Sequence, residues 1–181
     1  GSGASGRNTT IIRANYRTPE GAEFYKASVK LYEGLGADLD FNLLFSQQGH
    51  LPLAHSDRGL ITANERAEVN QLLGLDSRVI YPDEIAELCP EMDLSEDVTW
   101  PVQAALYHPP GGIIRHDAVV WGYARGADRR GIEIHPYTEV TGIQRSNGRV
   151  TGVETTRGHV QTDMVVNATA GWSTLVADLA E

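Results

Sequence analysis

Apolar residues recur at helical spacing in three segments of the first half of the chain. The first covers residues 19–35, where Thr18 is a suitable capping residue and Pro19 suits the first helical turn. The second covers residues 62–73, and the third covers residues 81–88. The pattern therefore predicts three helices, the last of them short and entered through a proline.

The middle of the chain alternates between short extended runs and one further helix. Two apolar runs within residues 41–54 flank Gly49, which predicts a hairpin or two edge strands. A strand is expected at residues 104–107. Asp117 then predicts the cap of a helix that runs to about Arg130.

The last fifty residues or so change to an extended pattern. Residues 132–134 are expected to be extended, and an Asn-Gly dipeptide at 147–148 separates alternating runs at 139–144 and 150–155. Asn-Gly between such runs is a strong hairpin signal. The apolar run at 164–166 predicts a buried strand. The whole order of elements predicts a mixed α/β protein.

Composition places the chain among ordinary globular proteins. It has 181 residues, of which 41% are apolar and 22% charged, enough for one domain or a large part of one. The formal net charge of −9 argues against a surface for DNA or RNA, because such surfaces gain affinity by placing Lys and Arg on phosphates. Nucleic acid is therefore not expected as a partner.

Redox and targeting signals are few. The single Cys89 cannot form an internal disulfide, and no segment has the pattern of a signal peptide. No apolar run approaches the roughly 20 residues that a membrane-spanning helix needs. These features predict a cytoplasmic protein that does not span a membrane.

The glycine-rich opening is a candidate cofactor-binding loop. Successive glycines leave backbone N–H groups free to approach a phosphate or a flavin, and Arg7 adds positive charge. A flexible leader, with Gly1 and Ser2 left over from expression, explains the same residues. Arg13 presents a planar fork of donors suited to a carboxylate, although a surface salt bridge is the commoner use of such a residue.

The segment at residues 111–117, which reads GGIIRHD, is the most specific feature of the sequence. His116 is expected immediately before the cap of a helix, where the positive end of the helix dipole disfavours imidazolium. A neutral imidazole there could serve as a base, a ligand or a covalent attachment point, or could merely bond near the cap. The six histidines show no paired spacing typical of zinc, so no metal site is expected.

Three segments together resemble a known family. They are residues 6–13 (GRNTTIIR), 107–122 (YHPPGGIIRHDAVVWG) and 165–172 (VVNATAGW). They are similar to the β subunits of heterotetrameric sarcosine oxidases, within the glycine oxidase and D-amino acid oxidase group of flavoproteins. The likeness extends over essentially the whole chain, and the middle segment is particular to these subunits.

The resemblance implies an FAD-dependent oxidoreductase fold, in which a Rossmann-like FAD/NAD(P)-binding domain is joined to a substrate domain. FAD-binding parts are expected near residues 1–17 and 105–181, and part of the substrate domain near residues 38–104. Family members begin with a strand and a G-x-G-x-x-G turn into a helix, and no such strand-turn-helix unit is found in this sequence. We therefore expect the chain to be an internal fragment that lacks the N-terminal βαβ unit. On its own, such a fragment is expected to bind FAD poorly and not to turn over sarcosine.

The resemblance also implies a set of site residues. His116 matches the histidine that carries FMN covalently. Arg13 matches the arginine that holds the substrate carboxylate. Noncovalent FAD is expected to contact Ser2, Gly3, Arg7, Thr9, Ile11, Val140 and Gly171.

The implied reaction is the oxidative demethylation of sarcosine, an N-methyl amino acid, to glycine. Hydride passes to FAD, electrons pass to FMN, and oxygen is reduced to hydrogen peroxide, with methylenetetrahydrofolate formed when tetrahydrofolate is present. The implied partners are α, γ and δ subunits. Two other interpretations stay open: a single-chain FAD-dependent amino acid or amine oxidase without covalent FMN, and a non-catalytic interaction module.

Overall fold

The computed structural model describes residues 3–180 and divides the chain into two compact units, Gly1–Ile132 and Glu133–Glu181. We call them the larger unit and the smaller unit. Each unit contains helices and antiparallel strands, so the predicted mixed α/β class is confirmed.

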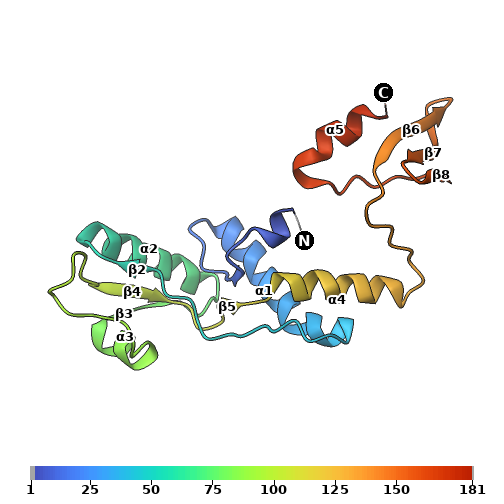
Figure 1. Ribbon diagram of the computed structural model, residues 1–181. Helices are drawn as coiled ribbons and strands as arrows, with labels where there is room; N and C mark the ends of the chain where they lie inside the picture. Colours follow the sequence, from blue (N-terminus) through green and yellow to red (C-terminus); the bar gives the residue numbers. More distant parts are fainter. Residues whose placement is uncertain (1–2, 181) are drawn as a thin grey trace. The chain divides into compact units, whose positions relative to one another are not determined.

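The described residues form the following elements in chain order (Figure 1). The larger unit holds η1 (Ala4–Gly6), β1 (Ile11–Ile12), α1 (Pro19–Leu39), β2 (Leu53–Ala54), α2 (Asp57–Leu72), β3 (Arg78–Ile80), α3 (Pro82–Leu88), β4 (Ala104–Tyr107), β5 (Gly112–Ile113) and α4 (His116–Asp128). The smaller unit holds β6 (Val140–Ser146), β7 (Arg149–Thr155), β8 (Gly158–Gln161), η2 (Ala170–Trp172) and α5 (Ser173–Asp178).

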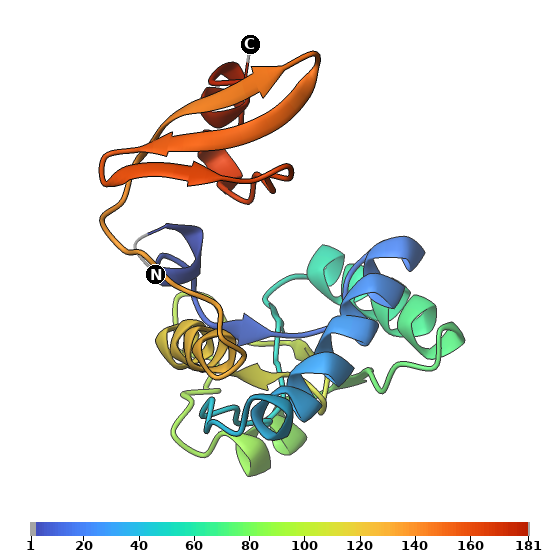
Figure 2. The ribbon, with the colours of Figure 1, turned by 90° about the vertical axis from the view of Figure 1, so that its right-hand side faces the viewer.

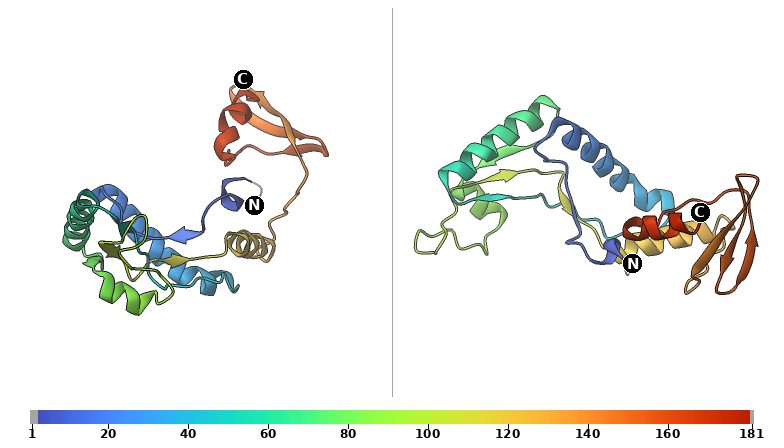
Figure 3. Two further views of the ribbon diagram at one scale, coloured as in Figure 1. Left: turned by 60° about the vertical axis from the view of Figure 1, so that its left-hand side comes forward. Right: turned by 90° about the horizontal axis from the view of Figure 1, so that it is seen from above.

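An antiparallel three-stranded sheet, in the order β2-β4-β3, organises much of the larger unit. Figure 1 shows α2 on one side of this sheet and α3 on the other, and Figure 3 shows the same elements from two further directions. Successive residues of β4 point to opposite faces. Leu106 accordingly joins a buried cluster with Ala63 of α2, whereas Ala105 joins one with Ile85 of α3.

Strands β1 and β5 form a second, two-stranded antiparallel sheet that leads into α4. Gly112 pairs with Ile12, and a Cβ added at Gly112 would lie 2.2 Å from the backbone oxygen of Ser46. Only glycine lets the chain approach so closely here. A buried cluster that includes Leu39 and Ile114 joins the end of α1 to the start of α4.

In the smaller unit, β6, β7 and β8 form an antiparallel meander, with α5 beside it (Figure 2). Asn147 and Gly148 connect β6 to β7 with φ of +50° and +75°, the left-handed pair of a two-residue hairpin turn. The predicted Asn-Gly hairpin is therefore confirmed. The N–H of Ile143 donates to the carbonyl of Leu179 at 3.1 Å and so ties β6 to the chain after α5.

The three helices predicted in the first half are confirmed, with shifted ends. The helix α1 begins at Pro19, where the hydroxyl of Thr18 caps it as expected, and it continues beyond the predicted end to Leu39. The helix α2 begins before the predicted residue 62, because Ser56 caps it and its first three residues, Asp57 to Gly59, carry no apolar signal.

The helix α4 begins earlier than predicted. Arg115 is the N-cap residue and His116 is the first helical residue, so the prediction that Asp117 caps the helix is wrong. The guanidinium of Arg115 binds the carboxylate of Asp117 at 2.9 and 3.1 Å, within the first turn. The helix ends at Asp128, two residues before the predicted Arg130, and Gly131 follows it with φ of +77°.

Residues 41–54 do not form the hairpin that was one of two predictions for them. Ser46 pairs with Ile113, and β2 pairs with β4, so each run finds its partner far along the chain. The other prediction, edge strands, is confirmed for β2, which lies at the edge of its sheet. The strand β3 was not predicted, because three residues are too few to show an alternating pattern.

Two extended predictions in the last fifty residues or so are wrong. Residues 132–134 are irregular, and so is the apolar run at 164–166. Met164 is 73% exposed and Val166 is 80% exposed, because within residues 3–180 no strand lies beside this run. No helix in the described part of the chain has the length and apolar character needed to cross a membrane.

Candidate functional site

A hollow of about 270 Å³ lies between the loop that enters β1 and the start of α4. It brings together three of the residues expected to bind flavin: Thr9, Ile11 and His116. We call it the His116 hollow. Its other lining residues are Ser5, Asn8, Thr10, Ile12, Tyr32, Ile114, Val119 and Val120.

The imidazole of His116 lines the His116 hollow and is partly exposed. Its side chain is 32% exposed, and its Nδ1 lies 4.0 Å from the nearer carboxylate oxygen of Asp117, beyond hydrogen-bond distance. Arg115 holds that carboxylate instead. His116 is therefore not committed to an ion pair and faces the hollow with its ring accessible.

The loop that forms one wall of the His116 hollow has a fixed and strained shape. The side-chain amide of Asn8 donates to the carbonyls of Ala4 and Ser5, and its Oδ1 accepts from the N–H of Thr10 at 2.8 Å. Thr10 has φ of +62°, which is uncommon for a β-branched residue. Backbone strain of this kind persists where the surroundings enforce it, and it is typical of ligand sites.

The His116 hollow fits part of a flavin and not a whole dinucleotide. Its volume lies just below the range of about 300–1,000 Å³ typical of ligand pockets. Ile12, Val119 and Val120 provide apolar wall, which suits a flat aromatic ring, and Thr9 and Asn8 provide polar groups. The hollow therefore has the kind of lining, and part of the volume, that a flavin ring system needs.

The other expected cofactor contacts lie elsewhere. Gly3 precedes η1 and Arg7 follows it, and neither lines the His116 hollow. Val140 begins β6 and Gly171 lies in η2, so both belong to the smaller unit. Ser2 lies outside the described residues.

A second polar site surrounds Asn15, which follows β1 and is completely buried. Arg13 Nη1 donates to Asn15 Oδ1 at 3.4 Å, and Arg66 Nη2 donates to the backbone carbonyl of Asn15. Within residues 3–180, neither arginine has a carboxylate within 4.0 Å, so the alternative of a surface salt bridge for Arg13 is not observed. We call Arg13, Asn15, His50, Arg66 and His108 the Asn15 cluster.

His108 fixes the backbone next to Arg13. It is completely buried, and its Nε2 accepts a hydrogen bond from the N–H of Ala14 at 3.3 Å. The ring proton therefore lies on Nδ1, which donates to the carbonyl of Asp76 at 2.7 Å. Burial lowers the pKa of His108, so the ring is neutral at pH 7.

His50 pairs with His108 through the backbone, each N–H donating to the other's carbonyl at 3.0 Å. Burial, reinforced by the positive charge of Arg13, lowers the pKa of His50 to about 4. The ring is therefore neutral at pH 7. Its buried Nδ1 has no hydrogen-bond partner in the described part of the chain.

Arg66 carries positive charge into a partly buried position. Burial lowers its pKa, and repulsion from Arg13 and Arg17 adds to this, but a guanidinium still stays charged at pH 7. Its Nε and the Nδ2 of Asn15 are buried, and neither has a partner among residues 3–180. A carboxylate would satisfy both the unmet donors and the unbalanced charge.

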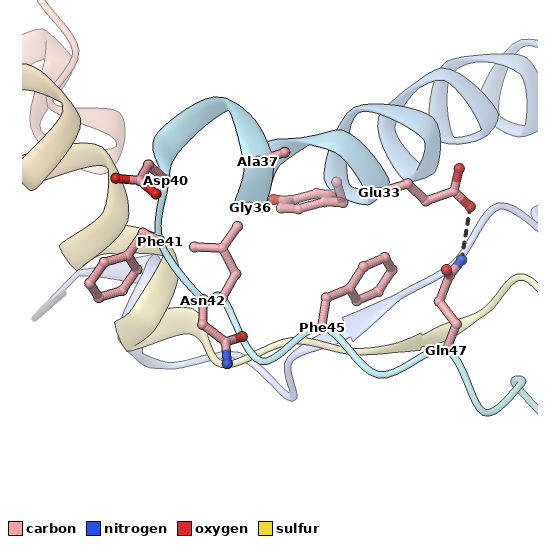
Figure 4. Close-up of a pocket in the computed structure, with 10 residues that line it drawn as sticks. Glu33, Gly36, Ala37, Asp40, Phe41, Asn42, Phe45 and Gln47 are labelled. Atoms are coloured by element: carbon pink, nitrogen blue, oxygen red, sulfur yellow. Dashed lines mark hydrogen bonds between the residues drawn. The ribbon is translucent and has the colours of Figure 1, made fainter.

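A larger hollow, of about 600 Å³, lies at the end of α1 but is a weaker candidate (Figure 4). Its two acidic side chains already have partners. Gln47 donates to Glu33 at 2.9 Å, and Arg129 donates to Asp40 at 2.9 Å. None of the expected site residues lines it.

Sequence reasoning named Arg13 and His116 but did not recognise the rest of the Asn15 cluster as a site. Asn15, His50, Arg66 and His108 stand in no shared local motif, and folding alone brings them together. No group of three or more His, Cys, Asp or Glu within residues 3–180 could hold a metal ion.

Known proteins similar to this chain include sarcosine oxidase subunits and an L-proline dehydrogenase. The family model for FAD dependent oxidoreductase matches residues 1–181. The sarcosine oxidase subunit beta of Rhizobium meliloti (strain 1021) is 47% identical over 180 residues, which are 99% of this chain and 43% of that protein. The sarcosine oxidase subunit beta of Arthrobacter sp is 42% identical over 178 residues, which are 98% of this chain and 44% of that protein.

A solved structure supports the same fold. The L-proline dehydrogenase from P. horikoshii matches with a TM-score of 0.86 and 31% identity, over 99% of this chain and 46% of that one. The chain thus spans less than half the length of each of these relatives.

Proposed function

This chain belongs to the FAD dependent oxidoreductase family, and we propose that the protein containing it oxidises sarcosine to glycine as the β subunit of a sarcosine oxidase. The likeness to sarcosine oxidase β subunits along nearly the whole chain carries this proposal. Bound FAD supplies an acceptor for the hydride that leaves the carbon next to the substrate nitrogen. The residues of the chain bind and orient the substrate and the flavin.

Arg13 is the proposed partner of the substrate carboxylate. Its guanidinium lies 4.5 Å from the centroid of the Tyr16 ring, and Tyr16 stacks on Tyr25 with 3.9 Å between the ring centroids. A guanidinium fixed in this way loses little freedom when it binds a carboxylate through two parallel N–H bonds. It would thereby fix the position of the N-methyl group of sarcosine.

His116 is the proposed attachment point of FMN. Its accessible ring opens into the His116 hollow, where Ile12 and Val119 would lie against an attached flavin. Covalent attachment needs one ring nitrogen free, and Asp117 does not engage it because Arg115 binds that carboxylate. The proposed noncovalent contacts to FAD come from Ser2, Gly3, Arg7, Thr9, Ile11, Val140 and Gly171.

The proposed organisation of the protein follows the same likeness. Residues near 1–17 and 105–181 belong to the FAD-binding part, and residues near 38–104 belong to the substrate domain. The two bacterial relatives are each a β subunit of a sarcosine oxidase, which supports an assembly with further chains. We assign α, γ and δ subunits as those partners, with methylenetetrahydrofolate as a product when tetrahydrofolate is supplied.

Mass analysis of the peptide that contains His116 tests the flavin assignment. The whole protein, purified with its partner subunits, is assayed for sarcosine-dependent hydrogen peroxide and then digested. We expect the peptide to carry the added mass of FMN and to lose it in His116→Asn. The control is His135→Asn, an exposed histidine of the smaller unit, which should keep the adduct.

Two other results would change the assignment. A yellow, sarcosine-oxidising protein with an unmodified His116 peptide would support an oxidase that uses FAD alone. A colourless, folded protein in the complete assembly would contradict both forms of the proposal and would support an interaction module.

A further inference from the structure

Arg13 and Arg66 lie far apart in the sequence, yet both donate hydrogen bonds to Asn15. Arg13 reaches the side-chain oxygen of Asn15, and Arg66, from the middle of α2, reaches its backbone carbonyl. Asn15 has no exposed surface, and its Nδ2 lacks a partner among the described residues. Two guanidiniums thus meet at a single buried residue, where Arg66 Nε and Asn15 Nδ2 are donors without an acceptor among the described residues.

The neighbouring groups do not balance this positive charge. No Asp or Glu within residues 3–180 comes within 4.0 Å of either guanidinium. His50 and His108 face the same cluster as neutral rings, and Arg17 adds further positive charge. An anionic ligand would relieve the repulsion between the arginines and give their N–H groups an acceptor.

We propose that Arg66 is a second binding residue for the substrate carboxylate, which lies between Arg66 and Arg13 with Asn15 Nδ2 as a further donor. The inference rests on the proposed function and deepens it, because the family resemblance assigns Arg13 alone. A second guanidinium adds charge-assisted hydrogen bonds to a carboxylate ligand. A neutral amide ligand of the same shape would gain less from them, because it carries no charge. Arg66 therefore makes the site selective for free carboxylates.

Selectivity between a carboxylate and its amide tests this role. Arg66→Met and Arg66→Lys are compared with the parent in the whole protein with its partner subunits. Acetate and acetamide are the competitive inhibitors, and sarcosine and its primary amide are the substrates. Arg58→Met is the matched control, because Arg58 is an exposed arginine on the same helix.

Arg66→Met should raise the inhibition constant of acetate and the KM of sarcosine by about tenfold or more, as expected for the loss of a charged donor. The constants for acetamide and for the amide substrate should stay within about twofold of the parent, because they gain little from the charge. Arg66→Lys should fall between Arg66→Met and the parent, and Arg58→Met should match the parent.

An unchanged acetate constant in a folded Arg66→Met protein would overturn the inference, and so would an equal loss for acetate and acetamide. If Arg66→Met does not fold, Arg66→Lys decides, since it keeps the charge but loses the planar fork. An unchanged acetate constant in Arg66→Lys would then count against the proposal. If the parent does not oxidise sarcosine, the proposed function fails, and calorimetric titration with acetate and acetamide still compares the same variants.

Discussion

Replacing His108 by leucine should destabilise the protein by about 2–4 kcal/mol, because the buried N–H of Ala14 and the part-buried carbonyl of Asp76 lose their partner. The N–H of Ala14 donates to Nε2 of His108 at 3.3 Å, and the carbonyl of Asp76 accepts from Nδ1 at 2.7 Å. Each buried group left unsatisfied costs about 1–3 kcal/mol, and the apolar surface of leucine offsets part of that sum.

Urea unfolding measures the total loss, and amide hydrogen exchange at Ala14 locates it. In His108→Leu the Ala14 amide should exchange faster than neighbouring amides that keep their acceptors. His135→Leu is the control, because His135 is exposed and its ion pair with Glu133 is worth about 0–1 kcal/mol at most. A loss below about 1 kcal/mol in His108→Leu, or an Ala14 amide that stays protected, would show that His108 does not hold this backbone in place.

Three further predictions concern the same unit. The pKa of His50 is lowered from 6.5 to about 4, so the unfolded state takes up a proton first as the pH falls, and the stability that is complete above pH 6.5 declines toward pH 4. The free energy of unfolding, measured with urea across that range, should fall with a slope that is smaller in His50→Gln by up to about 1.4 kcal/mol per pH unit. Gly112→Ala should cost more than about 2 kcal/mol in urea unfolding, because its Cβ would collide with the backbone of Ser46, whereas Gly3→Ala, which meets nothing within 4 Å, should be nearly neutral. Arg13→Met should raise the KM for sarcosine by about tenfold or more in steady-state assays, and an unchanged KM would remove Arg13 from the carboxylate site.

Local chemistry made several elements of the fold predictable. Thr18 with Pro19 marks the start of α1, and the Asn-Gly pair at 147–148 marks the hairpin of the smaller unit, because caps and tight turns depend on residues next to them. The start of α2 at Asp57 was not predicted, because its first three residues carry no large apolar side chain and only the cap at Ser56 signals it.

Elements that depend on distant partners were harder to predict. The apolar runs within residues 41–54 suggested pairing with each other, but they pair with residues 104–113, and nothing in a local pattern distinguishes the two arrangements. The run at 164–166 is apolar enough for a buried strand, yet strand formation needs a neighbour, and the part of the chain that the structure describes offers it none.

The candidate site residues also differ in whether the local sequence points to them. His116 and Arg13 could be proposed from the sequence, because each stands in a short segment with its own chemical logic. The Asn15 cluster could not, since Arg66 meets Asn15 across 51 positions and His108 meets Ala14 across 94. Such a cluster of unmet donors exists only after folding.

The absorbance of the bound flavin, recorded without oxygen before and after sarcosine is added, shows whether the protein transfers hydride from sarcosine to its flavin. The sample is the whole protein with its partner subunits. We expect the flavin absorbance to bleach with sarcosine and to recover when oxygen is admitted, with hydrogen peroxide formed in equal amount to the glycine released. A flavin spectrum that sarcosine leaves unchanged would contradict the claim that this family member oxidises an N-methyl amino acid.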